Sequence, residues 1–167
     1  RDLFVRQIGQ MKRVVAGMGI ASADAEDVLQ DVFVEAAKRN DHFNSTGHAV
    51  RWLMRVTVNR CRLDFRRTKR FRKVVREIQV DKLLKTNSVP SSPADAASAR
   101  EELSVMQETL RGLDEPLLCP LVLRYFCGLD SGQIGEILGM PPSTVRSRLR
   151  DGRMILAEQL MNRGVMP

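Results

Sequence analysis

The sequence is poor in the residues that build metal and redox sites. Its 167 residues include three cysteines and two histidines, and no two cysteines form a C-x-x-C pair. This ligand count and spacing argue against a zinc site. We expect free thiols in a reducing cytoplasm. The alternative is that Cys119 and Cys127, on one predicted helix, are redox-sensitive.

Long apolar runs are also missing. No stretch approaches the length of a membrane span, and no signal peptide is visible. The chain opens on Arg1 rather than Met, so we expect residues to be missing before it. Paired carboxylates in a plausible pocket, a nucleophile with its base, a phosphate-cradling glycine loop and a metal set are not recognisable. We therefore predict a cytoplasmic protein that is not an enzyme and has no cofactor.

Positive charge, in contrast, is in excess. The net charge of +7 and a pI of about 9.9 make nucleic acid the leading class of partner, with an anionic membrane surface second. The basic residues gather between Arg51 and Lys73, where Asp64 is the single acid. Because no Gly or Pro interrupts this run, we predict one long helix.

Six basic residues of that helix fall on one stripe, roughly 60° wide at about 100° per residue. The members of this basic stripe are Arg51, Arg55, Arg62, Arg66, Lys69 and Lys73. The residues on a neighbouring, apolar side are Trp52, Leu53, Val56 and Leu63. We expect the apolar side to pack and the stripe to bind phosphates in a salt-dependent way. The alternative is a solvated basic face.

Two more helices are predicted before it. The first spans 3–18 and ends at Gly17 and Gly19, and the second spans about 24–39 with Ser22 or Asp24 as its cap. The polar side of the second carries an acidic face, made of Asp27, Gln30, Asp31 and Glu35. Asp31 and Glu35 lie too far along to serve the helix dipole, so we interpret this face as a docking surface for a basic partner.

A loop, 40–47, then leads into the basic helix, and its Phe43 is either a plug or an exposed stacking group. Pro and Ser residues at 86–93 indicate an open linker. We predict an all-α protein of two small helical domains, 1–76 and 99–167, joined by a flexible linker at 77–98.

The second domain is predicted to end in a helix-turn-helix. A helix at 117–126 with Pro120 near its first turn is followed by a short helix, capped by Ser131 and ended by Gly139, and by a long helix from about Ser143. The residues assigned to the core side of the long helix are Val145, Leu149, Gly152, Leu156 and Leu160. Those opposite are Ser143, Arg146, Ser147, Arg150 and Met154. The short hydroxyls and the arginines among them suit major-groove and phosphate contacts, and the alternative is a solvated amphipathic helix.

Taken together, these stretches resemble the sigma-70 family of bacterial transcription initiation factors. The best match is its compact extracytoplasmic-function class, which keeps only sigma regions 2 and 4. The matching segments, in the family's order, are DAEDVLQDVF at 24–33, WLMRVTVNR at 52–60 with DFRR at 64–67, LRYF at 123–126 with GL at 128–129 and QIGEILG at 133–139, and TVRSRL at 144–149. Single segments are weak signals, but four in order are specific.

The resemblance implies partners and roles. The acidic face would meet the clamp coiled coil of the polymerase β′ subunit, and part of the second domain would meet the β flap. Residues implied in binding the unstacked −10 strand are His42, Phe43, Asn44, Arg51, Arg55, Asn59, Arg62 and Arg66. Residues implied in −35 duplex binding are Ser143, Thr144, Arg146, Ser147 and Arg150. An anti-sigma factor is a further implied partner, and the linker would let it clamp both domains together.

Three departures from the family pattern stand out. Asp151 replaces a basic residue, which puts nearby −35 contacts in doubt, and Gly135 replaces an alanine, which we expect to be a mild change. Arg60 replaces an apolar residue, and we expect its long stem to reach outward. Two rival functions remain: a helix-turn-helix regulator that works without polymerase, and an interaction protein whose basic helices dock an acidic protein or a membrane.

Overall fold

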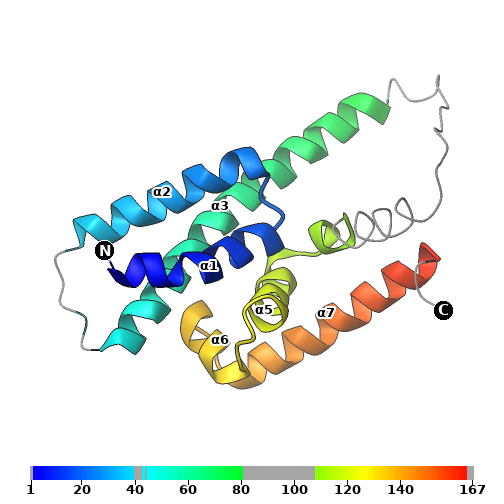
Figure 1. Cartoon of the computed structure of the whole chain (residues 1–167). Helices are drawn as coiled ribbons and strands as arrows, with labels where there is room; N and C mark the ends of the chain where they lie inside the picture. The colour runs from blue at the N-terminus through cyan, green and yellow to red at the C-terminus, as the bar shows by residue number, and fades with distance from the viewer. Residues whose placement is uncertain (1, 40–42, 44, 81–107, 165–167) are drawn as a thin grey trace, which may run out of the picture.

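The computed structural model describes residues 2–39, 43, 45–80 and 108–164, and in its longest helix it describes side chains as far as Thr68. All regular structure in these ranges is helical. The helices are α1 (Asp2–Gly17), α2 (Ser22–Lys38), α3 (Thr46–Val80), α5 (Glu115–Tyr125), α6 (Ser131–Leu138) and α7 (Pro142–Asn162), and residues 108–112 are also helical (Figure 1). The predicted all-α class is confirmed. Of the linker predicted at 77–98, only 77–80 are described, and they form the end of α3.

The N-terminal half is built on α3. Helices α1 and α2 pack against it and against each other, and their apolar sides form a shared core. The most deeply buried members are Met11, Val14, Val15, Met18, Val32, Met54 and Val58. The predicted apolar side of α3 is buried only over its first part, because Leu53 and Val56 are buried whereas Leu63 is 57% exposed.

Two predicted helix caps were wrong. Helix α2 follows Ala21, which has no side-chain cap, and the Ala21 carbonyl accepts hydrogen bonds from the backbone N–H groups of Asp24 and Ala25, both at 3.0 Å. Helix α6 is capped by Asp130 rather than by Ser131. The Asp130 carboxylate accepts from two backbone N–H groups of the first turn, and the Gln133 side chain accepts from the Asp130 N–H, which is a capping box.

The position of Pro120 was also predicted wrongly. Helix α5 begins at Glu115, two residues earlier than expected, because Pro116 occupies the first turn where proline is favoured. Pro120 therefore lies inside the helix and is buried. It has no N–H to donate to the carbonyl of Pro116, four residues earlier, so α5 lacks one intrahelical hydrogen bond at this point.

The helix-turn-helix is formed by α6 and α7, and α5 packs against both. Gly139 ends α6 with φ of 69°, in the left-handed region that favours glycine. Along α7, Val145, Leu149, Gly152 and Leu160 are buried as predicted, and Leu156 is partly buried. A Cβ at Gly152 would lie 2.8 Å from Leu121 Cδ1, so the absence of a side chain lets α5 and α7 approach closely.

Gly135 lies against the turn between these helices. An alanine there should therefore cost more stability than the mild change expected from the resemblance to the family. A Cβ at Gly135 would lie 2.6 Å from the backbone oxygen of Met140, whose own N–H donates to the Gly135 carbonyl at 3.0 Å. We predict that Gly135→Ala lowers the free energy of unfolding by roughly 1–3 kcal/mol, because the turn backbone must move. Urea unfolding followed by circular dichroism measures it.

Gly9→Ala is the matched control for that substitution. Gly9 lies inside α1, and a Cβ there would meet nothing within 4 Å, so alanine should stabilise the protein by about 0.5–1 kcal/mol. Equal stability of Gly135→Ala and the native protein would show that the turn adapts without cost.

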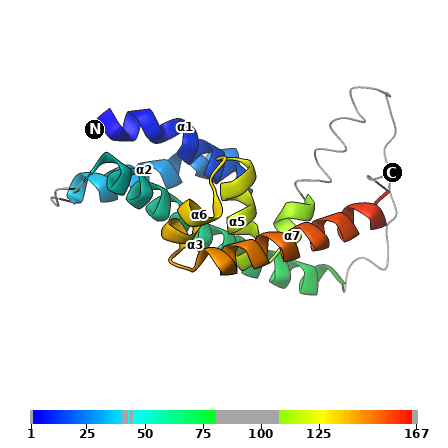
Figure 2. The ribbon, with the colours of Figure 1, turned by 90° about the horizontal axis from the view of Figure 1, so that it is seen from below.

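The two halves of the chain also pack together. Helices α5 and α6 lie against α3, and α5 also contacts α1 (Figure 2). A Cβ at Gly17 would lie 2.7 Å from Val122 Cγ1, so the end of α1 touches α5 directly. Beside this contact, the Cys119 thiol donates to the Met18 sulfur at 3.8 Å. The basic stripe of α3 is therefore close to the second half of the chain.

Candidate nucleic-acid interface

The first four members of the basic stripe are brought together as predicted, but they face α5 and α6. Arg51 Nε forms an ion pair with Glu136 Oε2 at 2.8 Å. Arg55 Nε donates to the Ile137 carbonyl at 3.0 Å, and its Nη2 donates to the Glu136 carbonyl. Lys69 and Lys73, the remaining members, lie outside the described side chains. The stripe thus binds anionic and carbonyl oxygens within its own chain.

Arg55 completes the end of a helix in the other half of the chain. The last four carbonyls of an α-helix have no partner within the helix. In α6 the Gly135 carbonyl accepts from the N–H groups of Gly139 and Met140. Those of Glu136 and Ile137 accept from the Arg55 guanidinium instead. A cation here also favours the helix dipole, whose negative end lies at this terminus.

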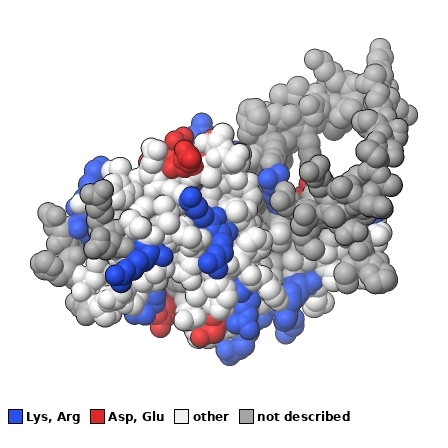
Figure 3. Space-filling view, viewed as in Figure 1, with Lys and Arg blue, Asp and Glu red and all other residues white. Residues whose placement is uncertain are grey.

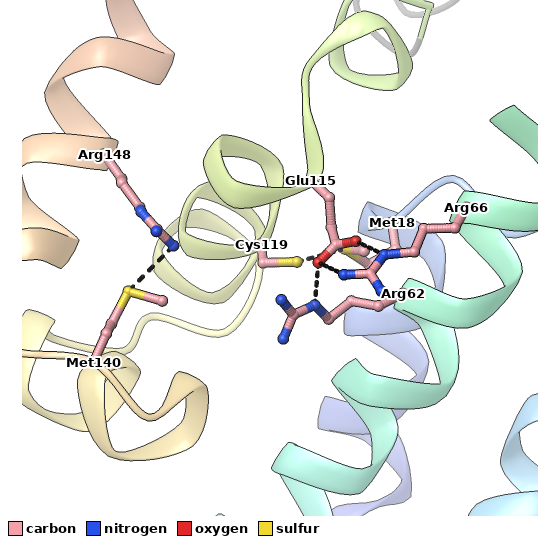
Figure 4. Close-up of polar contacts among 7 residues, drawn as sticks. All are labelled: Met18, Arg62, Arg66, Glu115, Cys119, Met140 and Arg148. Atoms are coloured by element: carbon pink, nitrogen blue, oxygen red, sulfur yellow. Dashed lines mark hydrogen bonds and ion pairs between the residues drawn. The ribbon is translucent and has the colours of Figure 1, made fainter.

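The other two arginines meet one buried carboxylate. Glu115, in the first turn of α5, has a side chain that is 8% exposed, and Arg62 and Arg66 both bond to it (Figure 4). Burial alone would raise the pKa of Glu115. The hydrogen bonds and charges of the two guanidinium groups outweigh burial and lower its pKa below the ordinary value of 4.5. Glu115 is therefore a carboxylate at neutral pH.

An aromatic cluster stands at the start of α3. The Phe43 ring lies 5.6 Å from the Trp52 ring and 5.7 Å from the His48 ring, centroid to centroid. The Arg39 guanidinium lies over both Phe43 and Trp52, at 5.1 Å and 4.6 Å. Phe43 and Trp52 are half-buried, so each is packed yet still reachable. His42 and Asn44, also assigned to this site, lie outside the described residues, and Asn59 is exposed.

The acidic face of α2 is open to solvent. All four of its members, Asp27, Gln30, Asp31 and Glu35, are exposed. Asp31 Oδ2 pairs with Arg60 Nη2 at 2.9 Å, so Arg60 reaches across to α2. Val34, on the same side of the helix, is 46% exposed and adds an apolar surface. The face thus combines charge with apolar area, as a protein-binding surface does.

The predicted reading surface lies on the first turns of α7. Ser143, Arg146 and Arg150 are exposed, and Thr144 and Ser147 are partly buried. Arg150 is not free, because its Nε pairs with Asp151 at 3.2 Å and its Nη2 donates to Ser147 Oγ at 3.4 Å. Arg146 is the exposed cation of α7 nearest the helix start. Figure 3 shows more basic than acidic groups on the face it presents.

The three cysteines are buried and form no disulfide. Burial raises the pKa of Cys61 and of Cys119 to about 12, and it also raises the pKa of Cys127. Each is therefore protonated at neutral pH and a poor nucleophile while the protein is folded. The described residues contain no group of three or more metal-ligand side chains, and none of the described helices is long and apolar enough to cross a membrane.

Sequence reasoning missed Glu115 and Glu136, the acids that meet the basic stripe. Glu115 precedes Pro116 at a helix start, where an acid normally serves the dipole, and Glu136 lies on the polar side of a short helix. Neither position signals a partner in a distant part of the chain. Arg39 was missed too, because a single arginine after a helix carries no signal of stacking.

Comparisons with known proteins match both halves of the chain. The model of sigma-70 region 2 matches residues 3–71, and that of sigma-70 region 4 matches residues 103–156. The RNA polymerase sigma factor NccH of Alcaligenes xylosoxydans xylosoxydans is 28% identical, over 96% of this chain and 86% of its own length. The ECF RNA polymerase sigma factor SigW of Bacillus subtilis is 28% identical, over 82% of this chain and 75% of its own.

A solved structure shows the same fold. The sigma factor RpoE of Bartonella quintana, determined in complex with the anti-sigma factor NepR, aligns with a TM-score of 0.60 at 23% identity. The alignment covers 91% of this chain and 90% of that one. The arrangement of helices found here is therefore one that a known protein adopts.

Proposed function

Because the chain belongs to the sigma-70 family of RNA polymerase sigma factors, in its extracytoplasmic-function class, we propose that separate surfaces of the protein bind core polymerase and promoter DNA. The protein binds core RNA polymerase and directs it to promoters. This assignment rests on one observation: the chain has an exposed acidic face on α2 and an exposed, basic first turn on α7. One surface suits a basic protein and the other suits DNA.

Core polymerase docks on the acidic face of α2. Asp27, Gln30, Asp31 and Glu35 present the charge, and the exposed Val34 adds apolar contact. The clamp coiled coil of the β′ subunit is the proposed partner there, and the β flap is the proposed partner of the second domain. Such charge complementarity sets orientation and on-rate more than affinity.

The −10 strand lies along α3 and the aromatic cluster. The arginines of the basic stripe, Arg51, Arg55, Arg62 and Arg66, bind its phosphates, and Asn59 offers an amide to a base edge. Phe43 and Trp52 give unstacked bases a ring to stack on, worth about 1–3 kcal/mol per base. Melting then needs no chemical step, because preferential binding of the single strand pulls the duplex open. The factor has no catalysis of its own and works in the cytoplasm, beside its polymerase.

The −35 duplex binds the start of α7. Ser143, Thr144, Arg146, Ser147 and Arg150 enter the major groove or contact its phosphates, as residues at the start of a recognition helix do. Helix α6 packs against α7, and the turn that begins at Gly139 joins the two helices.

Transcription from a library of random promoters tests this function. Purified bacterial core polymerase is assayed with and without the protein, and RNA start sites are sequenced. We expect protein-dependent starts that share two spaced sequence elements. Core polymerase that gains neither specific initiation nor affinity for the protein would contradict the assignment and leave duplex binding by the helix-turn-helix as the surviving function.

An anti-sigma factor is a further proposed partner. The RpoE relative was solved with one bound, at 23% identity, which supports the fold and motivates the search. Affinity capture of the chain from its source cell, before and after stress, is the measurement. If no inhibitor co-purifies under any condition, this partner is rejected.

Asp151 gives a prediction for −35 binding. Its carboxylate holds Arg150 at 3.2 Å and repels nearby phosphates. We expect Asp151→Ala to raise affinity for the −35 duplex about three- to tenfold, because it frees one cation and removes one repulsion. Fluorescence anisotropy at two salt concentrations measures it. The control is Glu158→Ala, which removes another exposed acid from α7; an equal gain in both variants would assign the effect to net charge alone.

A further inference from the structure

The acidic face of α2 is not uniform, because one of its acids is already paired. Asp27, Asp31 and Glu35 recur every four residues, so they form a row about 12 Å long with Asp31 in the middle. Asp31 Oδ2 pairs with Arg60 Nη2 at 2.9 Å. Asp27 and Glu35 form no ion pair with any described residue. The middle of the acidic face is therefore neutralised from within the chain.

Arg60 differs from the arginines of the basic stripe in the direction that it faces. At about 100° per residue, it lies at least about 120° around α3 from every member of the stripe. The stripe faces α5 and α6, whereas Arg60 faces α2. Arg60 therefore belongs with the acidic face and not with the proposed −10 surface.

The ion pair between Arg60 and Asp31 is held in place at the edge of the docking face. Arg60 Nε is buried and has no hydrogen-bond partner among the described residues. The side chains of Arg60 and Asp31 are 39% and 55% exposed. A guanidinium that has partly left water needs a nearby opposite charge, and Asp31 supplies it. A partner that binds the Asp31 carboxylate must therefore compete with Arg60, whereas Asp27 and Glu35 are open.

Arg60 opposes a basic partner in two ways. It occupies one carboxylate oxygen of Asp31, and it places a positive charge beside the middle of the acidic row. Partly exposed charges at an interface act mainly on the association rate, and salt screens their effect. The apolar contact offered by Val34 does not depend on this pair.

We propose that Arg60 limits the affinity of the acidic face for its basic protein partner by holding Asp31 in an internal ion pair. This inference rests on the proposed docking of core polymerase on α2. A lower affinity means that the protein captures a smaller share of core polymerase at a given concentration. Arg60 is thus an affinity-setting residue that lies on α3, beside the docking helix.

Three substitutions of Arg60 in the full-length chain separate its charge from its bulk. Arg60→Ala removes the cation, and Arg60→Gln removes the charge but keeps a polar side chain. Arg60→Lys keeps a positive charge within reach of Asp31. The control is Arg13→Ala, which removes an exposed cation from α1, a helix that belongs to neither proposed binding surface.

Binding to immobilised bacterial core polymerase, followed by biolayer interferometry at two salt concentrations, is the first readout. We expect Arg60→Ala and Arg60→Gln to bind about three- to fivefold more tightly than the native protein, mainly through faster association. The gain should shrink at the higher salt concentration, because salt screens exposed charges. Arg60→Lys and Arg13→Ala should stay within about twofold of the native affinity.

A double-mutant cycle is the second readout. Asp31→Ala is measured in the native chain and in the Arg60→Ala variant. We expect the loss of affinity to be larger when Arg60 is absent, because Asp31 is then open to the partner. Equal losses in the two backgrounds would show that Arg60 acts only through overall charge, which overturns the role of the ion pair.

The remaining outcomes distinguish this inference from the function on which it rests. Unchanged or weaker binding of both neutral variants overturns the inference, and so does a gain that Arg13→Ala shares. If the native chain binds core polymerase in these cases, docking stands and the limiting role of Arg60 alone fails. If the native chain has no affinity for core polymerase, docking on α2 fails and the inference fails with it.

Discussion

Reversing one charge on α2, by Asp27→Arg, should nearly abolish binding to core polymerase. Asp27 is exposed on the acidic face, and reversal of a close interfacial charge costs about 2–5 kcal/mol, or at least about 30-fold in affinity. Asp31 is a poorer choice, because it already pairs with Arg60 and its reversal would also break that ion pair. Biolayer interferometry with immobilised core polymerase gives the affinity.

Glu26→Arg is the matched control for Asp27→Arg. It makes the same change of charge on the preceding residue of α2, about 100° around the helix from Asp27 and about 40° beyond Gln30, which forms the edge of the acidic face. We expect its affinity to stay within about threefold of the native value. Both variants should bind −35 duplex DNA as the native protein does. Equal losses of polymerase binding in the two variants would mean that net charge, and not this face, mediates docking.

Removing one side chain from α7, by Arg146→Ala, should weaken −35 binding about 10- to 100-fold. A good guanidinium contact with a base pair contributes about 1–3 kcal/mol of discrimination. Arg146 is exposed in the first turns of α7, where a recognition helix meets base edges. Anisotropy with the duplex selected from the promoter library measures the loss, and substitutions across the duplex show at which base pair specificity relaxes.

Arg163→Ala serves as the comparison for Arg146→Ala. Arg163 follows the last turn of α7, about 25 Å along the helix from Arg146, and pairs with Glu108 at 3.1 Å. Its loss removes the same charge far from the proposed groove contact, so affinity should change less than about threefold. If Arg146→Ala weakens all sequences equally, Arg146 contacts phosphate only and base reading lies elsewhere on α7.

Helical periodicity was enough to predict the elements, because each helix buries one side. The spacing of Val28, Leu29 and Val32 predicted α2, and that of Val145, Leu149 and Gly152 predicted the buried side of α7. Helix starts were less well predicted, since a helix cap depends on one side chain rather than on a pattern repeated over many residues. Asp130 and Ser131 are both good caps by composition, and only the backbone shows that Asp130 bonds the first turn.

The basic stripe was predicted from one helix, but what it faces was not predictable. Angular spacing places Arg51, Arg55 and Arg62 on a common side because that depends on α3 alone. Their bonds to Glu115 and Glu136 depend on how two distant segments pack, and no local pattern encodes that. The same limit explains Gly135, whose importance comes from the carbonyl of Met140 rather than from its neighbours in the helix.

Through Arg55, the stability of α6 in the helix-turn-helix depends on the presence of the first domain. The guanidinium supplies the final hydrogen bonds of α6, so a C-terminal fragment made alone would lack this partner for two carbonyls of that helix. Thermodynamic linkage makes this dependence reciprocal. A ligand that binds Arg55 and breaks these hydrogen bonds destabilises the end of α6, and a ligand that stabilises α6 strengthens its hydrogen bonds with Arg55. The two surfaces that we propose for promoter binding are for this reason coupled in free energy, because Arg55 contributes to both.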